Sequence, residues 1–245
     1  MTAEYREQIL NNYLRVLQNV EEAAKNSGRN PEDIKLVVVT KKQPVEVVEA
    51  AYQCGMRKFG ENYVEEGLIK INALNQMNDI EWHMIGHVQS RKARLVCENY
   101  QYVHSLDSKK LAEKLNTYCQ QRKMKLPVLL EVNVSGEISK SGFRIAGISD
   151  KQELLNTIDK ISTYEHIEIH GLMTMPPFSI NPRDSIPCYD LIIELQNYLQ
   201  INRPTINWKE LSMGTSFDYQ VAIEKGATIV RIGEAILGSR NKKLN

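Results

Sequence analysis

The feature that most constrains the fold of this chain is an alternation, repeated eight times, of a short apolar segment with an amphipathic one. The first apolar segment, Leu36–Val39, contains three β-branched residues in succession, which is typical of a strand buried on both faces. The eight predicted strands begin near residues 36, 58, 81, 102, 128, 168, 210 and 228, and a predicted helix follows each of them. This alternation predicts parallel strands joined by right-handed crossovers.

The length of the chain favours a closed barrel among the α/β architectures. Eight strand–helix units in 245 residues match the ~250 residues typical of a (β/α)8 TIM barrel. Residues 1–28 are predicted to add an N-terminal helix, since Tyr5 and Ile9 begin a run of apolar residues spaced by three and four. No break in composition marks a linker, so residues 1–245 are predicted to form a single domain with the barrel at residues 35–238.

An open, doubly wound sheet is the alternative architecture. Such sheets often carry a glycine-rich phosphate-binding loop after their first strand. This chain has Lys41-Lys42-Gln43-Pro44 at that position instead, which favours the barrel.

The composition excludes several classes of protein. The chain is 42% hydrophobic and 25% charged with a net charge of +1, so no global field attracts nucleic acid or anionic membranes. The polar N-terminus lacks the apolar core of a signal peptide, and no apolar run reaches the length of a membrane span. The four cysteines form no C-x-x-C pair and the five histidines show no metal-ligand spacing. We therefore expect a cytoplasmic protein with no nucleic-acid, membrane or metal partner.

Barrel proteins bind their ligands at the carboxyl ends of the strands. The first strand ends at Lys41 and Lys42, just before Pro44 begins a helix. A lysine there can act as a nucleophile, because partial burial lowers its pKa. Solvated loop charges are the alternative, and from this stretch alone they are the more common outcome. The predicted ends of later strands carry Asn62 and His83.

The ends of the last two strands carry a pattern typical of a phosphate site. Ser212–Ser216 supplies hydroxyls and a glycine, and Arg231–Ala235 supplies an arginine, a glycine and a helix start. Taken singly, these segments could be a helix-capping loop and a structural ion pair. Together, after strands seven and eight of a barrel, they favour phosphate binding. A lysine facing that phosphate suggests pyridoxal phosphate held as a Schiff base.

Seven motifs then resemble the YggS/PROSC family of pyridoxal phosphate homeostasis proteins, which is similar in fold to the fold-type III barrel of alanine racemase. They span most of the chain in the same order as in the family: Thr40–Pro44, Phe59–Tyr63, Trp82–Lys92, Lys140–Gly142, His170–Met173, Leu211–Gly214 and Val230–Gly233. The Trp82–Lys92 motif is the most specific of them.

The resemblance implies a pyridoxal phosphate cofactor and a role for each matching residue. Lys41 matches the lysine that forms the Schiff base, and Arg231 matches the arginine that faces the pyridine nitrogen. The other implied cofactor-binding residues are the phosphate cradle and the lining of the pocket: Ser212, Gly214, Thr215 and Gly233, with Asn62, His83 and Met173.

Three positions depart from the family pattern. Thr215 stands where many relatives have methionine, and Glu234 stands where several have threonine, so a hydroxyl contact to phosphate from residue 234 is lost. Lys42 replaces a small polar residue, so two lysines are adjacent; Lys42 is expected to point to the opposite side of the strand.

The guanidinium of Arg231 argues against strong catalysis. It only donates hydrogen bonds, so it would keep the pyridine nitrogen unprotonated and make the ring a weak electron sink. Racemisation also needs a second acid/base, which in alanine racemase comes from a partner's C-terminal domain. The chain ends at Asn245 without such a domain, so we expect a monomer with little or no amino-acid turnover.

Three functional hypotheses follow. The first is a homeostasis protein that buffers pyridoxal phosphate and delivers it to apoenzymes. The second is a pyridoxal phosphate-dependent racemase-like enzyme, and the third is a cofactor-free barrel enzyme acting on a phosphorylated metabolite. The sequence leaves open whether Ser135–Gly147 is a lid or a plain surface loop.

Overall fold

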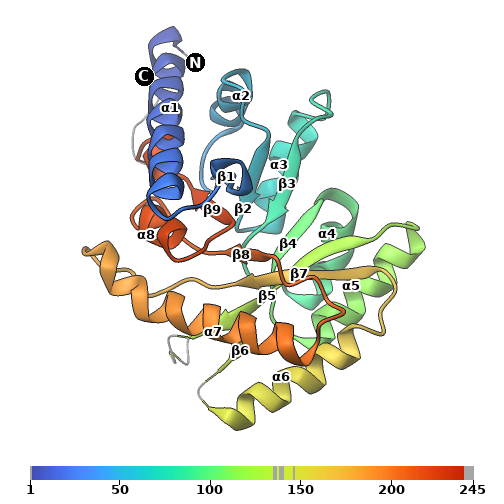
Figure 1. The fold of residues 1–245 in the computed structure, drawn as a ribbon. Coiled ribbons are helices and arrows are strands. Elements are labelled where there is room, and N and C mark those ends of the chain that lie inside the picture. Colours follow the sequence, from blue (N-terminus) through green and yellow to red (C-terminus); the bar gives the residue numbers. More distant parts are fainter. Residues whose placement is uncertain (1, 135–136, 138–140, 146, 240–245) are drawn as a thin grey trace.

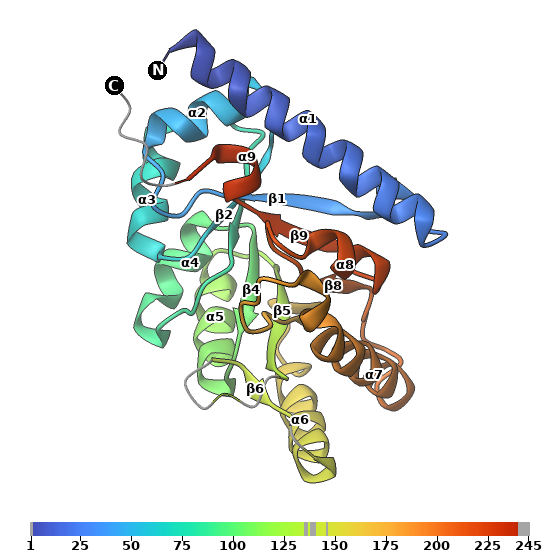
Figure 2. The same cartoon turned by 90° about the vertical axis from the view of Figure 1, so that its left-hand side faces the viewer.

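Eight parallel strands form a closed barrel, surrounded by helices, in the computed structural model (Figures 1 and 2). The structure describes residues 2–134, 137, 141–145 and 147–239. The strands follow each other around the ring in the order β4-β3-β2-β1-β9-β8-β7-β5, and an additional β4–β5 pairing closes it. The predicted TIM barrel is confirmed, and the open-sheet alternative is wrong because both edges of the sheet are paired.

The barrel strands are β1 (Lys35–Val39), β2 (Lys58–Glu61), β3 (Glu81–Met84), β4 (Tyr102–Leu106), β5 (Leu126–Asn133), β7 (Ile167–Met173), β8 (Glu210–Ser212) and β9 (Ile229–Ile232). The α-helices are α1 (Ala3–Asn26), α2 (Val45–Gln53), α3 (Val64–Ala73), α4 (Ala93–Asn99), α5 (Lys109–Gln121), α6 (Ile148–Ile161), α7 (Ile186–Asn202), α8 (Tyr219–Glu224) and α9 (Glu234–Leu237). Short 3₁₀ turns cover Pro31–Asp33, Ser90–Lys92 and Pro182–Ser185.

The N-terminal helix lies outside the ring and packs against the last two short helices, as Figure 2 shows. The Tyr5 hydroxyl donates to the carbonyl of Leu237 at 2.8 Å. The Asn19 amide donates to the Tyr219 hydroxyl, also at 2.8 Å. Helix α1 therefore covers α8 and α9, which are too short to be stable alone.

Two details differ from the sequence-based expectation. The three-residue spacing of Asn62 and Glu65 in the sequence predicts a capping box. This prediction is wrong: Tyr63 occupies the N-cap of α3 without a side-chain hydrogen bond. Strand β6 (Phe143–Arg144), which the sequence analysis missed, pairs in parallel with the end of β5. A two-residue strand leaves too short a pattern to detect.

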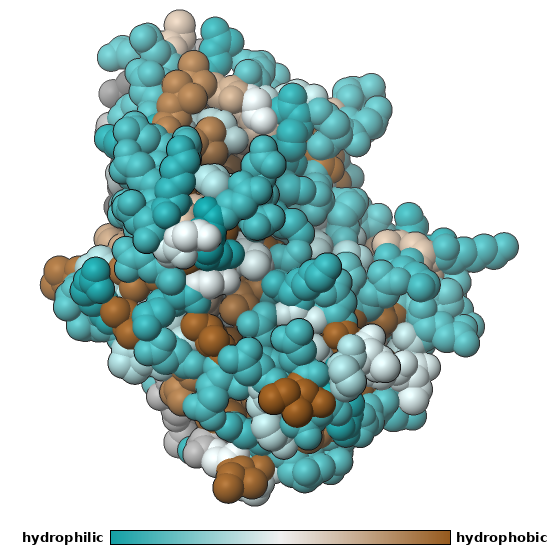
Figure 3. Space-filling model, viewed as in Figure 1, coloured by the Kyte–Doolittle hydropathy of each residue, from teal (hydrophilic) through white to brown (hydrophobic). Residues whose placement is uncertain are grey.

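The core has two parts, because alternate strand residues face opposite sides of the sheet. A large apolar cluster fills the space between strands and helices. A smaller cluster of Val37, Tyr102, Leu129, Met173 and Ile229 occupies the barrel interior. The surface in Figure 3 is mostly hydrophilic with separate apolar patches. Among the described residues, no helix is both long and apolar enough to cross a membrane.

Gly86 allows the loop after β3 to pass very close to the end of β2. A Cβ at this position would lie 2.3 Å from the carbonyl oxygen of Asn62 and 2.7 Å from its Cα. We predict that Gly86→Ala destabilises the fold by about 1–3 kcal/mol, the usual cost of overpacking against backbone.

Urea unfolding at neutral pH measures this change in the free energy of unfolding. The control is Gly147→Ala, where an added Cβ meets nothing within 4 Å and the expected cost is under about 1 kcal/mol. An equal effect of the two substitutions would contradict the close-approach argument.

Candidate functional site

A cavity of about 640 Å³ opens at the carboxyl ends of the barrel strands. Its lining comes from segments that follow almost every strand around the ring. The polar and charged lining residues that matter below are Lys41, Asn62, His87, Glu131, Thr215, Ser216, Arg231 and Glu234. A cavity at this end of a TIM barrel is the expected place for a ligand.

Lys41 reaches the cavity because the chain turns sharply at the end of β1. The backbone N–H of Gln43 donates to the carbonyl of Thr40 at 3.0 Å. Lys42 has φ +60°, in the left-handed region that non-glycine residues rarely adopt. Its backbone N–H donates to the Glu66 carboxylate. Lys41 therefore lines the cavity, whereas Lys42 does not.

A buried ion cluster behind the cavity anchors this turn. Lys70, on α3, has a side chain only 3% exposed. Its ammonium donates to the Thr40 carbonyl at 2.6 Å, to Glu61 at 2.7 Å and to Glu66 at 2.8 Å. The Thr40 hydroxyl also donates to Glu61. One ammonium thus ties β2 and α3 to the turn that carries Lys41.

The sequence analysis missed this cluster. Glu66 and Lys70 have the four-residue spacing of an ordinary surface ion pair on a helix. Nothing in that spacing indicates that Lys70 is buried. Burial raises the pKa of the Glu61 carboxyl, and the Lys70 ammonium acts against this shift.

We predict that Lys70→Met destabilises the protein by about 3–5 kcal/mol, because it leaves buried carboxylates without their cation. Adding Glu61→Gln should restore part of the loss. Urea unfolding near neutral pH measures both variants.

Lys151→Met is the matched control. Lys151 pairs with Glu194 at 2.8 Å, and the Glu194 side chain is 65% exposed, so its loss should cost less than about 1 kcal/mol. If Lys70→Met were no more costly than this control, the cluster would not anchor the turn.

Arg231 lies at the base of the cavity and is only 5% exposed. Its Nη1 donates to the Ser212 hydroxyl at 2.5 Å, and its Nη2 donates to the Thr174 carbonyl at 3.0 Å. Burial lowers the pKa of the guanidinium, and the negative charges of Asp218 and Glu131 oppose that shift. An arginine stays protonated even so, and it offers a ligand only hydrogen-bond donors.

Two backbone N–H groups converge on one oxygen at the start of α9. Gly233 N and Ala235 N donate to the Ser216 hydroxyl at 3.2 Å and 3.3 Å. Convergent backbone donors of this kind suit an anion such as a phosphate oxygen. A Cβ on Gly233 would lie 2.9 Å from the Val39 carbonyl oxygen, so only glycine permits this approach to β1.

Thr215 lines the cavity, but its polar groups are already bound. Its backbone N–H and its hydroxyl donate to Asp218 Oδ1 at 2.7 Å and 2.9 Å. The other oxygen of Asp218 accepts from Ser185 and Tyr189. The Asp218 carboxylate thus fixes the loop that presents Ser216.

Six of the nine predicted site residues line the cavity: Lys41, Asn62, Met173, Thr215, Arg231 and Gly233. His83, Ser212 and Gly214 do not, and their roles in binding the cofactor stay predictions. His83 is 2% exposed and lies deeper in the barrel. Ser212 binds Arg231 and His104 instead. Gly214 has φ +92°, and a Cβ there would lie 2.6 Å from the Cβ of Ala222, so the turn after β8 requires glycine at this position.

Two titratable groups in the cavity were missed by the sequence analysis. His87 lines the mouth, and its Nδ1 lies 2.6 Å from Asp107 Oδ2. Glu131 lines the cavity, and its Oε2 is buried without a hydrogen-bond partner in the described structure. The signal for Glu131 was a single carboxylate within the apolar strand Val128–Val134. Part of the loop proposed as a lid (residues 135–136, 138–140 and 146) lies outside the described residues.

Glu131 makes stability depend on pH. Burial first, and then the charge of Asp107, raise its pKa from 4.5 to about 7, although Arg231 and His87 oppose the shift. The folded state therefore keeps a proton that the unfolded state loses between about pH 4.5 and pH 7, so stability falls as pH rises through that window. The full penalty, at most about 3 kcal/mol, is present above it.

We predict that Glu131→Gln removes this penalty. The variant should match the wild type near pH 4.5 and should exceed it in unfolding free energy by up to about 3 kcal/mol near pH 8. Urea unfolding across that range measures the difference. Glu165→Gln, which changes an exposed carboxylate in the same way, is the control.

Comparison with known proteins agrees with this geometry. A family model described as alanine racemase, N-terminal domain, matches residues 12–241. The pyridoxal phosphate homeostasis protein of Vibrio alginolyticus is 41% identical over 87% of this chain and 90% of its own length.

Solved structures give the same assignment. PipY of Synechococcus elongatus, with pyridoxal phosphate bound, is 30% identical, with a TM-score of 0.78 over 90% of this chain and 100% of its own. An alanine racemase of Clostridium difficile shares the fold alone, at 17% identity and a TM-score of 0.70 over 94% of this chain and 56% of its own.

Fold and cavity together define a (β/α)8-barrel protein whose cavity holds a lysine after β1 and two convergent backbone N–H groups after β9. The chain belongs to the family of pyridoxal phosphate homeostasis proteins, whose barrel is that of the N-terminal domain of alanine racemase. The resemblance seen in the sequence motifs is thereby confirmed.

Proposed function

We propose that this chain binds pyridoxal phosphate through a Schiff base on Lys41 and acts in vitamin B6 homeostasis. The observation that carries the proposal is the cavity itself, which brings Lys41, Arg231 and the Ser216–Gly233 cradle together. When bound, the cofactor supplies an aldehyde, which condenses with the lysine amine to form a C=N bond and release water.

The residues of the cavity fit this cofactor. The two N–H groups of Gly233 and Ala235 now hold the Ser216 hydroxyl, and they offer an anion the same donors. Arg231 would present a donor to the pyridine nitrogen. Asn62 Oδ1 is buried without a partner in the described structure and lines the same cavity, so a donor group on a ligand would satisfy it.

We further propose that turnover of amino acids is slight. The reason is Arg231: a guanidinium only donates hydrogen bonds, so it cannot accept one from a protonated pyridine nitrogen. The nitrogen then stays unprotonated, which leaves the ring a weak electron sink. A lack of acid/base groups is not the reason, since His87 and Glu131 both line the cavity. Purified protein that racemised alanine at rates typical of enzymes, ~1–10³ s⁻¹, would support the racemase-like alternative.

We also propose that the protein is a cytoplasmic monomer that buffers the cofactor and delivers it to apoenzymes. The cavity mouth is open enough for exchange, since His87 at its rim has a side chain that is 53% exposed. A cofactor-free enzyme acting on a phosphorylated metabolite is the remaining alternative, and it predicts a protein without a visible absorption band.

We predict that the wild type, incubated with pyridoxal phosphate, shows the visible absorption band of a lysine Schiff base, and that Lys41→Ala loses this band. Lys42→Ala is the matched control, since Lys42 does not line the cavity, and it should keep the band. Absorbance before and after borohydride reduction makes the measurement. A wild type without a band would support the cofactor-free alternative. A band kept by Lys41→Ala would show that another lysine forms the Schiff base.

A further inference from the structure

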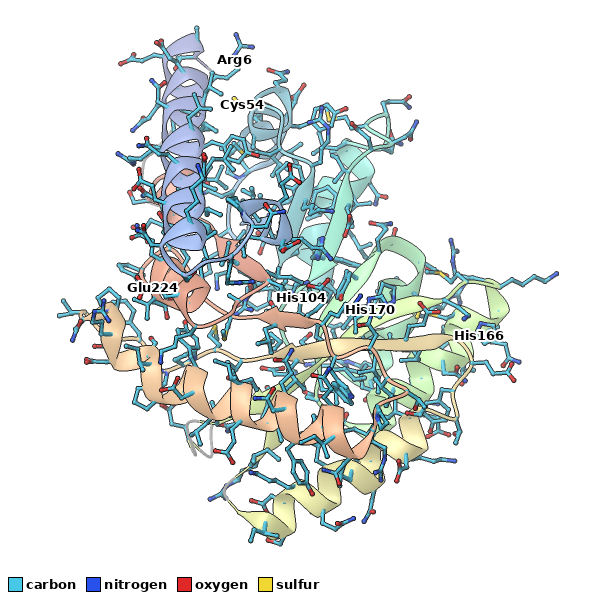
Figure 4. All side chains as sticks on the ribbon, in the orientation of Figure 1. Arg6, Cys54, His104, His166, His170 and Glu224 are labelled. Carbon is cyan, nitrogen blue, oxygen red and sulfur yellow. The ribbon has the colours of Figure 1, made fainter. Side chains whose placement is uncertain are left out.

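A chain of polar side chains crosses the barrel interior beneath the cavity. Ser212 on β8, His104 on β4 and His83 on β3 are each at most 2% exposed. His104 lies near the middle of the molecule in Figure 4, whereas Arg6 and Glu224 lie at its outside. Buried groups of this kind require hydrogen-bond partners, and they find them in one another.

The contacts are continuous from the cavity to the opposite end of β3. Arg231 Nη1 lies 2.5 Å from Ser212 Oγ, and His104 Nδ1 lies 2.8 Å from the same oxygen. His104 Nε2 lies 2.8 Å from His83 Nδ1. His83 Nε2 lies 2.9 Å from Glu81 Oε1, which is an ion-pair distance without the geometry of a hydrogen bond.

The carboxylate of Glu81 sets the direction of this chain. Contact with His83 and the charge of Lys58 lower its pKa to about 2, so it is ionised at neutral pH and can only accept hydrogen bonds. The approach of His83 Nε2 to this carboxylate is favourable only if Nε2 carries the proton. The Nδ1 of a neutral His83 then accepts from His104 Nε2, and His104 Nδ1 accepts from the Ser212 hydroxyl.

The guanidinium at the other end requires the same direction. Arg231 can only donate, so Ser212 Oγ accepts from it. The single proton of Ser212 is then available for His104 Nδ1. Both ends therefore give one consistent arrangement in which every donor points away from the cavity.

Both imidazoles are neutral in this arrangement. Burial lowers the pKa of each, and the nearby charges of Arg231, Lys35 and Lys58 act in the same direction. Only Glu81 favours a charged His83. Tyr102 stacks on the His83 ring at 5.3 Å between centroids and adds no charge at neutral pH, since burial raises the pKa of its hydroxyl.

We propose that Ser212, His104 and His83 are positioning residues that hold the Arg231 guanidinium at the cavity floor through a one-directional hydrogen-bond relay, which runs from Arg231 to His83 beside the Glu81 carboxylate. This inference rests on the proposed function, in which Arg231 faces the cofactor. Without His104, the Ser212 proton has no acceptor in the relay, so the direction of the Ser212 hydroxyl is no longer fixed. Arg231 then has one oriented acceptor, the Thr174 carbonyl, and one that is free to rotate.

The relay can be tested without any ligand. Nitrogen-15 NMR of the histidine side chains in the wild type should show His83 and His104 as neutral Nε2–H tautomers from about pH 5 to pH 8, a range that spans the ordinary histidine pKa of ~6.5. Signals are assigned by their loss in His83→Phe and His104→Phe. An Nδ1–H tautomer at either residue, or an imidazolium within this range, would overturn the relay.

The effect of the relay on cofactor binding is tested by comparing His104→Phe with the control His166→Phe. His166 lies at the start of β7, away from the cavity lining, and contacts the Met124 carbonyl (Figure 4). We expect His104→Phe to weaken the binding of pyridoxal phosphate up to about tenfold, as loss of one neutral hydrogen bond allows, and to shift the absorption band. His166→Phe should change the affinity less than twofold.

A folded His104→Phe, judged by near-UV circular dichroism, that keeps the affinity and the band of the wild type would overturn the positioning role. If His104→Phe does not fold, Ser212→Ala removes the hydroxyl that His104 orients, and its expected effect is at least equal. A wild type that does not bind the cofactor would instead refute the proposed function, and the NMR result would still decide the relay.

Discussion

The parallel pairing of β1 with β9 is the constraint on which the site depends. It places Leu36 beside Val230 and Val38 beside Ile232, so segments almost two hundred residues apart in sequence end at the same rim. Lys41 and the Gly233 cradle can therefore act on one ligand. The Gly233 backbone reaches the Val39 carbonyl because no side chain intervenes. Without closure of the ring, the first strand would lie at an edge of the sheet, remote from the last.

The sequence was sufficient to predict the barrel, because its evidence is periodic. Eight apolar segments, each followed by an amphipathic one, specify the strands, and glycine or proline often marks their ends. The position of Lys41 followed from the same pattern, since the carboxyl end of a barrel strand is a defined place. Ser212 and His83 show the limit of this reasoning: both are buried beneath the cavity, and the sequence does not tell whether a side chain near a strand end faces the ligand or the layer below.

The sequence could not predict the burial of four polar side chains, for a different reason. These are Lys70, Glu131, His83 and His104. Each is polar, and in sequence each looks like a surface residue or a site residue. Their burial is decided by contacts with distant strands and helices: Lys70 with the carbonyl of Thr40, and His104 with Ser212, 108 residues away. Such partners become visible only when the ring is closed. These buried polar groups also fix the geometry of the site: the Lys70 cluster anchors the turn that carries Lys41, and the histidine relay anchors Arg231.

We propose that Lys41 alone, held at the rim between β1 and the β8–β9 loops, forms the covalent bond to the cofactor. The sharpest test is mass spectrometry of peptides from wild-type protein that has been loaded with pyridoxal phosphate at one equivalent and reduced with borohydride. We predict one reduced adduct, on Lys41. An adduct chiefly on Lys42, or spread over surface lysines, would contradict it.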